Sequence, residues 1–88
     1  MIILAIPPAA FGNPIAYEID DDIIRKQIRP ILIQYAKANR LQMIDLYQET
    51  KAHPEWFTDG VHPNREGNQR IAEIAYRKLK EILTEREI

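Results

Sequence analysis

An unbroken apolar run, Ile2 to Ile6, opens the chain and ends at Pro7 and Pro8. A strand with one face in water alternates apolar and polar residues, whereas a continuous apolar run is typical of a strand buried on both faces, as in parallel sheets. Such a strand needs other strands beside it and helices over its faces. The run therefore favours an α/β fold, in which residues 7 to 19 form the loop that leaves the strand.

A helix is predicted from Asp20 to about Asn39. The aspartates at positions 20 to 22 supply capping oxygens and negative charge, both of which stabilise a helix N-terminus, but they lack the oxygen spacing and the closing Glu of a calcium loop. We expect a kink at Pro30, because proline has no N–H to donate and its ring crowds the carbonyl of Lys26. Apolar residues recur behind the aspartates at helical spacing, at Ile24, Ile28, Ile31, Leu32 and Tyr35.

A second strand is predicted over "LQMIDLY", Leu41 to Tyr47, and a loop from Gln48 to Pro63 follows it. A helical crossover between the two strands makes them parallel and right-handed. Asn64 can cap a final helix, and the chain therefore reads β-α-β-α. The apolar stripe of this last helix comprises Ile71, Ile74, Ala75, Leu79, Ile82 and Leu83.

The predicted sheet has an edge that needs covering, because two parallel strands alone are too few for a stable sheet. Three ways of covering this edge remain open. A second copy of the chain could pair through the strand at residues 2 to 6, another polypeptide could pair there, or residues 1 to 88 are the second half of a larger α/β domain.

The composition removes several classes of function. The chain has 88 residues, which is one domain at most, and a formal net charge of −1, so no single-sign field favours nucleic acid or a membrane surface. No basic residue precedes Arg25, so the apolar opening is not predicted to be a signal peptide, and the compartment stays open beyond that. The chain has no cysteine, which excludes disulfides and thiolate sites, and no serine.

The stretch "TDGVHPN" holds the strongest candidates for chemistry, Asp59 and His62. It lies in the loop after the second strand, and sites in open α/β sheets gather beyond the carboxyl ends of the strands. A tight turn at Gly60 can bring the carboxylate to Nδ1 of the imidazole, which leaves Nε2 as a general base. An isolated pair of this kind could equally be structural.

The longer string "FTDGVHPNREGNQRIAEIA" resembles the last motif block of the SGNH, or GDSL-like, hydrolases. "IILAIPP", "YAKAN" and "LQMIDLY" resemble what precedes that block, so the likeness covers nearly the whole chain but only the C-terminal half of the family's flavodoxin-like, three-layer fold. The resemblance implies a serine ester hydrolase acting on acyl or acetyl esters, with Asp59 and His62 as the acid and base of a Ser-His-Asp triad. It implies no metal or organic cofactor.

The chain departs from the family pattern because it holds neither the serine of the G-D-S block nor the oxyanion-hole blocks. We therefore expect these residues to be inactive alone, as a piece of a longer chain or one part of a two-part enzyme. Thr58 is a poor substitute, since no strand-to-helix elbow presents it. The alternative is a non-catalytic α/β module that associates through its strand edge and keeps the Asp-His turn as a relic.

Other residues have structural interpretations beside functional ones. A metal site of His53, Asp59 and His62 lacks a recognisable spacing, and His53 is more simply a loop residue. Asp45 at the end of the second strand is expected to cap the loop after it. Trp56 and Phe57 are expected to pack the loop and to shield the Asp59–His62 contact from water. Three residues of the first loop are candidates for substrate contact by location alone, namely Phe11, Asn13 and Tyr17.

Overall fold

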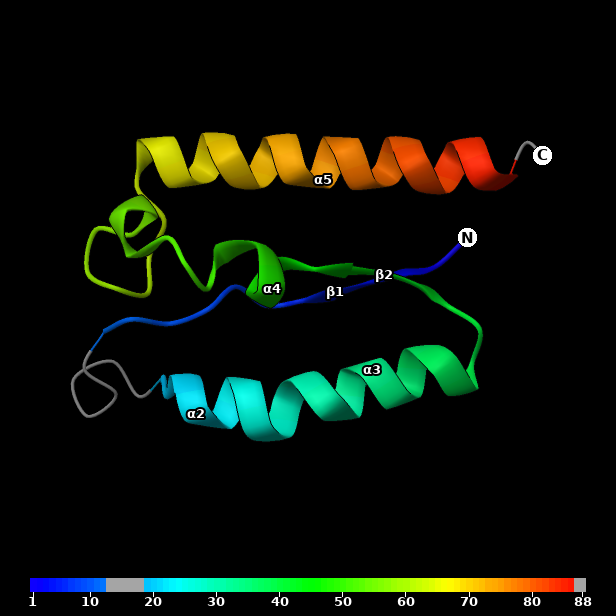
Figure 1. Ribbon diagram of the computed structural model, residues 1–88, viewed down its shortest axis with the longest axis horizontal. Helices are drawn as coiled ribbons and strands as arrows, with labels where there is room; N and C mark the ends of the chain where they lie inside the picture. Colours follow the sequence, from blue (N-terminus) through cyan, green and yellow to red (C-terminus); the bar gives the residue numbers. More distant parts are fainter. Residues whose placement is uncertain (13–18, 87–88) are drawn as a thin grey trace.

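A parallel two-stranded sheet lies between two helical layers in the computed structural model, which describes residues 1–12 and 19–86 (Figure 1). One layer is a helical run and the other is a single long helix. The elements in chain order are β1 (Ile3–Ile6), α2 (Asp21–Ile23), the π-helical turn η1 (Ile24–Ile28), α3 (Arg29–Ala38), β2 (Gln42–Asp45), α4 (Leu46–Thr50), the 3₁₀ turn η2 (Pro54–Trp56) and α5 (Arg65–Arg86). The predicted α/β class and β-α-β-α order are confirmed.

β1 and β2 are parallel, as predicted, in a register that pairs Ile3 with Gln42 and Ile6 with Asp45. β2 is shorter than the predicted Leu41 to Tyr47, because the chain turns into α4 at Leu46. The cause is local: Oδ1 of Asp45 accepts the backbone N–H of Gln48 at 3.0 Å and so caps a helix. The segment from Gln48 to Pro63, predicted as a loop, therefore begins inside α4. It also contains the 3₁₀ turn η2.

The helical run from Asp21 to Ala38 begins and ends where the sequence predicts. Asp20 is the N-cap, and its carboxylate accepts the N–H of Asp22, while Asn39 is the C-cap. Pro30 does not interrupt the helix. It lies in the first turn of α3, directly after the π-helical turn η1, where the N–H of Arg29 donates to the carbonyl of Ile24 across a wider turn.

Two apolar clusters hold the layers together. One joins the end of β1 to the helical run and α4 and is centred on Ile6, which is fully buried; its buried members are Ile6, Ala9, Ala10, Ile24 and Tyr47. The other joins the loop after η2 to α5 and consists of Trp56, Phe57 and Ile74, with Leu46 packed against them. Both clusters lie near the carboxyl ends of the strands, where the two loops meet.

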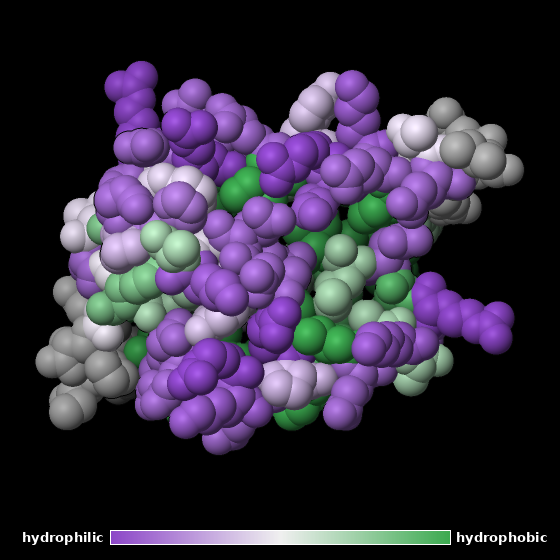
Figure 2. All heavy atoms as spheres, in the orientation of Figure 1, coloured by the Kyte–Doolittle hydropathy of each residue, from purple (hydrophilic) through white to green (hydrophobic). Residues whose placement is uncertain are grey.

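The predicted apolar stripes are only half covered. On α5, Ile74 and Ile82 are buried, but Leu79 and Leu83 are exposed, the latter by 52%. On α3, Ile31 is 64% exposed. Green surface is visible between the two helical layers in Figure 2. Within residues 1–12 and 19–86, β1 pairs with β2 alone, so a sheet of two strands is too narrow to cover both helices.

Of the helices in the described part of the chain, none has the length and apolarity needed to cross a bilayer.

Candidate active site

A short closed loop carries both predicted site residues. Its base is an isolated antiparallel bridge between Phe57 and Pro63, and the N–H of Thr58 donates to the carbonyl of His62 at 2.9 Å. Asn64 ends the loop and caps α5, since its Oδ1 accepts the N–H of Gly67 at 2.7 Å. The loop is therefore fixed at its exit by a helix N-terminus, as the sequence predicts.

The structure brings Asp59 and His62 into direct contact. Oδ2 of Asp59 lies 2.6 Å from Nδ1 of His62, and Oδ1 accepts the backbone N–H groups of Val61 at 3.0 Å and His62 at 2.8 Å. This is an Asx-type turn, in which the side chain replaces a backbone acceptor. Gly60 allows it, because its φ of 91° lies in the region that other residues avoid. The predicted geometry of the pair is confirmed.

The hydrogen bonds at Asp59 determine which nitrogen of the imidazole is basic. The N–H of Val61, the His62 ring and the N–H of His62 together lower the pKa of the Asp59 carboxyl to about 2. At neutral pH the carboxylate is ionised and can only accept, so Nδ1 of His62 carries the proton. Nε2 of the neutral ring is then the nitrogen that can take a proton.

The expected shielding of this contact by Trp56 and Phe57 is wrong. Both rings are buried, at 8% and 7% exposure, and they pack against Ile74 and Leu46. The side chain of His62 is nevertheless 73% exposed. The aromatic residues anchor the base of the loop to α5, whereas the turn with the pair lies beyond them. Nε2 is therefore accessible to a group approaching from outside these residues.

The loop after β1 lies against this turn. The N–H of Phe11 donates to the carbonyl of Gly60 at 2.6 Å, and the rings of Phe11 and Phe57 lie 5.4 Å apart at 47°. Phe11 is 37% exposed. The other two candidates for substrate contact on this loop, Asn13 and Tyr17, lie outside the described residues.

Asp45 has a structural role, as the sequence predicts, but it caps the helix α4 and not a loop. Besides capping α4, its Oδ2 accepts Nε and Nη2 of Arg29 at 3.0 and 2.7 Å. This contact raises the pKa of Arg29. The pair ties the start of α3 to the end of β2, and both carboxylate oxygens of Asp45 are used in these contacts.

His53 stacks on Trp56, with ring centroids 3.8 Å apart and planes 3° from parallel, and its Nδ1 lies 3.4 Å from Glu55. It is a loop residue packed on an aromatic ring. No group of three potential metal ligands from His, Cys, Asp or Glu occurs among residues 1–12 and 19–86, so His53, Asp59 and His62 do not form such a cluster.

Two residues that hold the loop after β1 do not stand out in the sequence. Thr50, fully buried on α4, accepts the N–H of Ala9 at 2.9 Å, and Asp21 accepts the N–H of Ala10 at 2.9 Å. The sequence pattern groups this aspartate with its neighbours as a helix start, although Asp20 alone is the N-cap. No signal in the sequence separates the three, because their different directions depend on what the helix packs against.

The contacts of Asp59 predict a specific acid response. Its pKa is about 2 in the folded chain against an ordinary 3.8, so its contribution to stability is complete above pH 3.8 and is lost as the pH falls through 2. We expect the carboxyl carbon of Asp59 to titrate near pH 2 in a ¹³C NMR experiment, and the Val61 and His62 amide resonances to shift with it. Titration of Asp59 at its ordinary value would contradict its hydrogen bonds to these amides and to the ring.

The fold and the pair together define an open α/β protein with an oriented acid–base pair beyond its strands. The family model for the GDSL-like Lipase/Acylhydrolase matches residues 1–75, and the chain belongs to this family. This confirms the resemblance found in the sequence. The chain is also 36% identical over 80 residues to an acetylxylan esterase of Xylanibacter ruminicola. That match covers 90% of this chain but 16% of the relative, and no solved structure gives a significant match.

Proposed function

We propose that these residues form the C-terminal part of a serine ester hydrolase, in which His62 is the general base for a serine that lies outside them. The observation that carries the proposal is the 2.6 Å contact between Nδ1 of His62 and the ionised carboxylate of Asp59, with the ring exposed. An imidazole held in this way has one nitrogen occupied and the other available, which is what a base acting on a hydroxyl requires.

In the proposed reaction, Nε2 of His62 takes the proton of the serine hydroxyl as the serine oxygen attacks the acyl carbonyl. The tetrahedral intermediate collapses, the C–O bond to the alcohol breaks, and Nε2 returns the proton to the leaving alcohol. Water then attacks the acyl-enzyme and loses its proton to Nε2. The bond between the acyl carbon and the serine oxygen breaks, Nε2 returns the proton to the serine, and the carboxylic acid is released. Asp59 keeps the ring in the required tautomer and stabilises the imidazolium in both steps.

The described residues would be inactive alone under this proposal, since 88 residues without a serine offer His62 no such hydroxyl. Where it has been measured, loss of the nucleophile of a triad lowers turnover on the order of 10⁶-fold. The relative that matches this chain is an acetylxylan esterase, which favours small acyl esters, such as acetyl groups on carbohydrate, as the substrate class.

The remaining edge of β1 is the place where the rest of the sheet would join. Ala5, in the middle of β1, is exposed. Ile2, the residue that precedes the strand, is 69% exposed. Either the other part of the hydrolase domain or a second copy of this chain would cover this edge. The same edge supports the alternative of a non-catalytic association module. The two hypotheses differ in whether a serine reaches His62.

An uncovered apolar edge predicts that the isolated 88-residue chain associates in solution. We expect multi-angle light scattering to give a mass above the 10.3 kDa of the single chain at micromolar concentration. Replacing the exposed Ala5 by Lys should shift the population toward monomer, because a charge opposes strand pairing. Lys in place of Gln42, an exposed residue of β2, is the matched control. A folded monomer at all concentrations would contradict the prediction.

The proposed function is tested first by reading the DNA ahead of the Met1 codon for a G-D-S block, and then by labelling the complete protein with a serine-reactive phosphonate. We expect one serine to be labelled, and labelling to be lost in His62→Ala but retained in His53→Ala. Absence of any labelled serine in the assembled protein would favour the association module.

A further inference from the structure

Three consecutive backbone amides hold the loop that leaves β1. Each donates to a different part of the fold, so the position of this loop is set jointly by α4, by the start of the helical run and by the turn at residue 60. The donors Ala9, Ala10 and Phe11 are bonded, in that order, to Oγ1 of Thr50 at 2.9 Å, to Oδ1 of Asp21 at 2.9 Å and to the carbonyl of Gly60 at 2.6 Å. The loop thus links the helical layer to the turn that carries Asp59 and His62.

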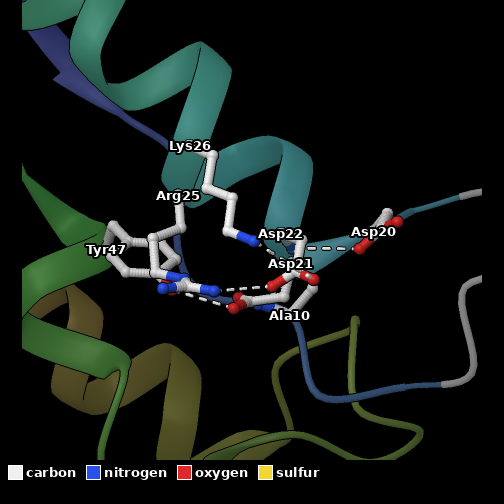
Figure 3. Close-up of polar contacts among 7 residues, drawn as sticks. All are labelled: Ala10, Asp20, Asp21, Asp22, Arg25, Lys26 and Tyr47. Atoms are coloured by element: carbon white, nitrogen blue, oxygen red, sulfur yellow. Dashed lines mark hydrogen bonds and ion pairs between the residues drawn. The ribbon is translucent and has the colours of Figure 1, made fainter.

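Asp21, in the first turn of the helical run, accepts hydrogen bonds from two other segments, the loop after β1 and α4. Its Oδ1 takes the N–H of Ala10, and its Oδ2 takes the hydroxyl of Tyr47 at 2.8 Å (Figure 3). Tyr47 is 5% exposed, and burial, followed by the contact with Asp21, raises the pKa of its hydroxyl, so it remains a donor. One carboxylate therefore binds the loop after β1 to α4 from the first turn of the helical run.

The neighbouring aspartates do not share this task. Asp20 caps the helix, and Asp22 lies outward, 2.7 Å from Arg25 and 4.0 Å from Lys26. In Figure 3 the carboxylate of Asp21 is bonded to the hydroxyl of Tyr47, whereas that of Asp22 is bonded to Arg25. Asp22 consequently offers a matched control: it has the same charge one residue later, with no bond to the loop after β1.

The contact between the loop and Gly60 reaches the pair directly, because Gly60 lies inside the Asx turn of Asp59. A Cβ atom on Gly60 would lie 2.7 Å from the carbonyl carbon of Phe11 and closer still to Gly12. Backbone packs on backbone at this point. A shift of the loop therefore moves the turn, and with it the direction in which the carboxylate of Asp59 meets its three donors.

We propose that Asp21 is a positioning residue for the Asp59–His62 pair. It accepts hydrogen bonds from the amide of Ala10 and the hydroxyl of Tyr47, and these two bonds fix the loop after β1. Phe11, the residue after Ala10, in turn donates its N–H to the carbonyl of Gly60. The consequence for ester hydrolysis rests on the proposed hydrolase function, whereas the consequence for the geometry of the pair does not. Because Thr50 still holds Ala9, loss of Asp21 is expected to loosen the loop locally and to leave the rest of the fold in place.

The test compares Asp21→Ala, Asp21→Asn and the control Asp22→Ala in the full 88-residue chain by NMR. In Asp21→Ala we expect the pKa of Asp59 to rise from about 2 toward 3.8, and exchange of the Phe11 amide to quicken about tenfold, the effect of one lost hydrogen bond. Asp21→Asn should restore most of both values, because an amide oxygen can still accept the N–H of Ala10. Asp22→Ala should change neither.

Tyr47→Phe keeps the test decisive if Asp21→Ala does not fold, because it removes one bond to Asp21 and preserves the ring. We expect it to shift both readouts in the same direction by a smaller amount. An unchanged Asp59 titration in a folded Asp21→Ala or Tyr47→Phe variant, no recovery in Asp21→Asn, or an equal shift in Asp22→Ala would overturn the proposal. None of these readouts needs ester turnover, so a failure of the proposed hydrolase function would be seen separately, in the phosphonate experiment.

Discussion

His62→Ala is expected to lower acetyl ester turnover by the complete enzyme by about 10⁴-fold or more, which is the size of effect found when a triad loses its base. The reason is that Nε2 is the one nitrogen left to take the hydroxyl proton once Nδ1 is bonded to Asp59. Asp59→Asn should also cost about 10⁴-fold, because an amide can donate to Nδ1 and so stabilise the wrong tautomer. Initial rates at saturating substrate measure both effects as changes in kcat.

His53→Ala is the matched control, since His53 is the other histidine of the chain and is stacked on Trp56 away from the Asp59 turn. We expect its kcat to stay within about threefold of the parent, which is the range of a packing change that leaves the reacting groups in place. Circular dichroism should show that all three variants keep the helical content of the parent. A His62→Ala enzyme with kcat close to the parent would remove His62 from the mechanism.

The second large effect is expected for Gly60→Ala, at about 3 kcal/mol of lost unfolding free energy, because two costs add. A side chain at a φ of 91° costs roughly 1 to 2 kcal/mol, and overpacking against a neighbour costs roughly 1 to 3 kcal/mol more. The overpacking is unavoidable here, because the new Cβ would lie 2.5 Å from Cα of Gly12. The atoms that it meets, in Gly12 and Phe11, all belong to the backbone and cannot rotate away as a side chain could. Urea denaturation of the parent and the variant measures the difference.

Thr58→Ala is the control for this substitution, because Thr58 is exposed in the same loop. Surface changes of this kind usually alter stability by no more than about 0.5 kcal/mol. Gly60→Ala should also speed exchange of the Phe11 amide, whose acceptor is the carbonyl of residue 60. A variant as stable as the parent would show that the loop after β1 does not rest on this turn.

Much of the frame could be predicted from local sequence. The apolar run at Ile2 to Ile6 predicts a parallel strand, Asp20 and Asn64 predict the starts of two helices, and all three features appear in the structure. These predictions succeed because each depends on residues close together in the chain. The predicted burial of the strand on both faces is wrong for these residues, because only Ile6 of β1 is buried and Ala5 is exposed. The end of β2 is a partial failure of the same reasoning: the sequence predicts that Asp45 caps a loop, whereas in the structure it starts a helix as early as Leu46.

The Asp59–His62 contact belongs with the local features. Asp59 and His62 are three residues apart with Gly60 between them, and a tight turn over this short stretch is enough to bring the two side chains together. In the structure Oδ2 of Asp59 lies 2.6 Å from Nδ1 of His62. The exposure of His62 could not be predicted in this way. Trp56 and Phe57 precede the pair in sequence and would shield it if the loop folded back, but their burial against Ile74 directs them to α5 instead.

The sequence by itself determined the strand, the helix starts and the carboxylate–imidazole pair, because short-range sterics and hydrogen bonds specify each of them. Only the tertiary structure decided that Asp21 faces inward to Tyr47 while Asp22 faces outward, and that the loop after β1 rests on Gly60. The physical reason is that identical side chains on one helical turn point in different directions. What each direction meets depends on packing between segments that are distant in the chain.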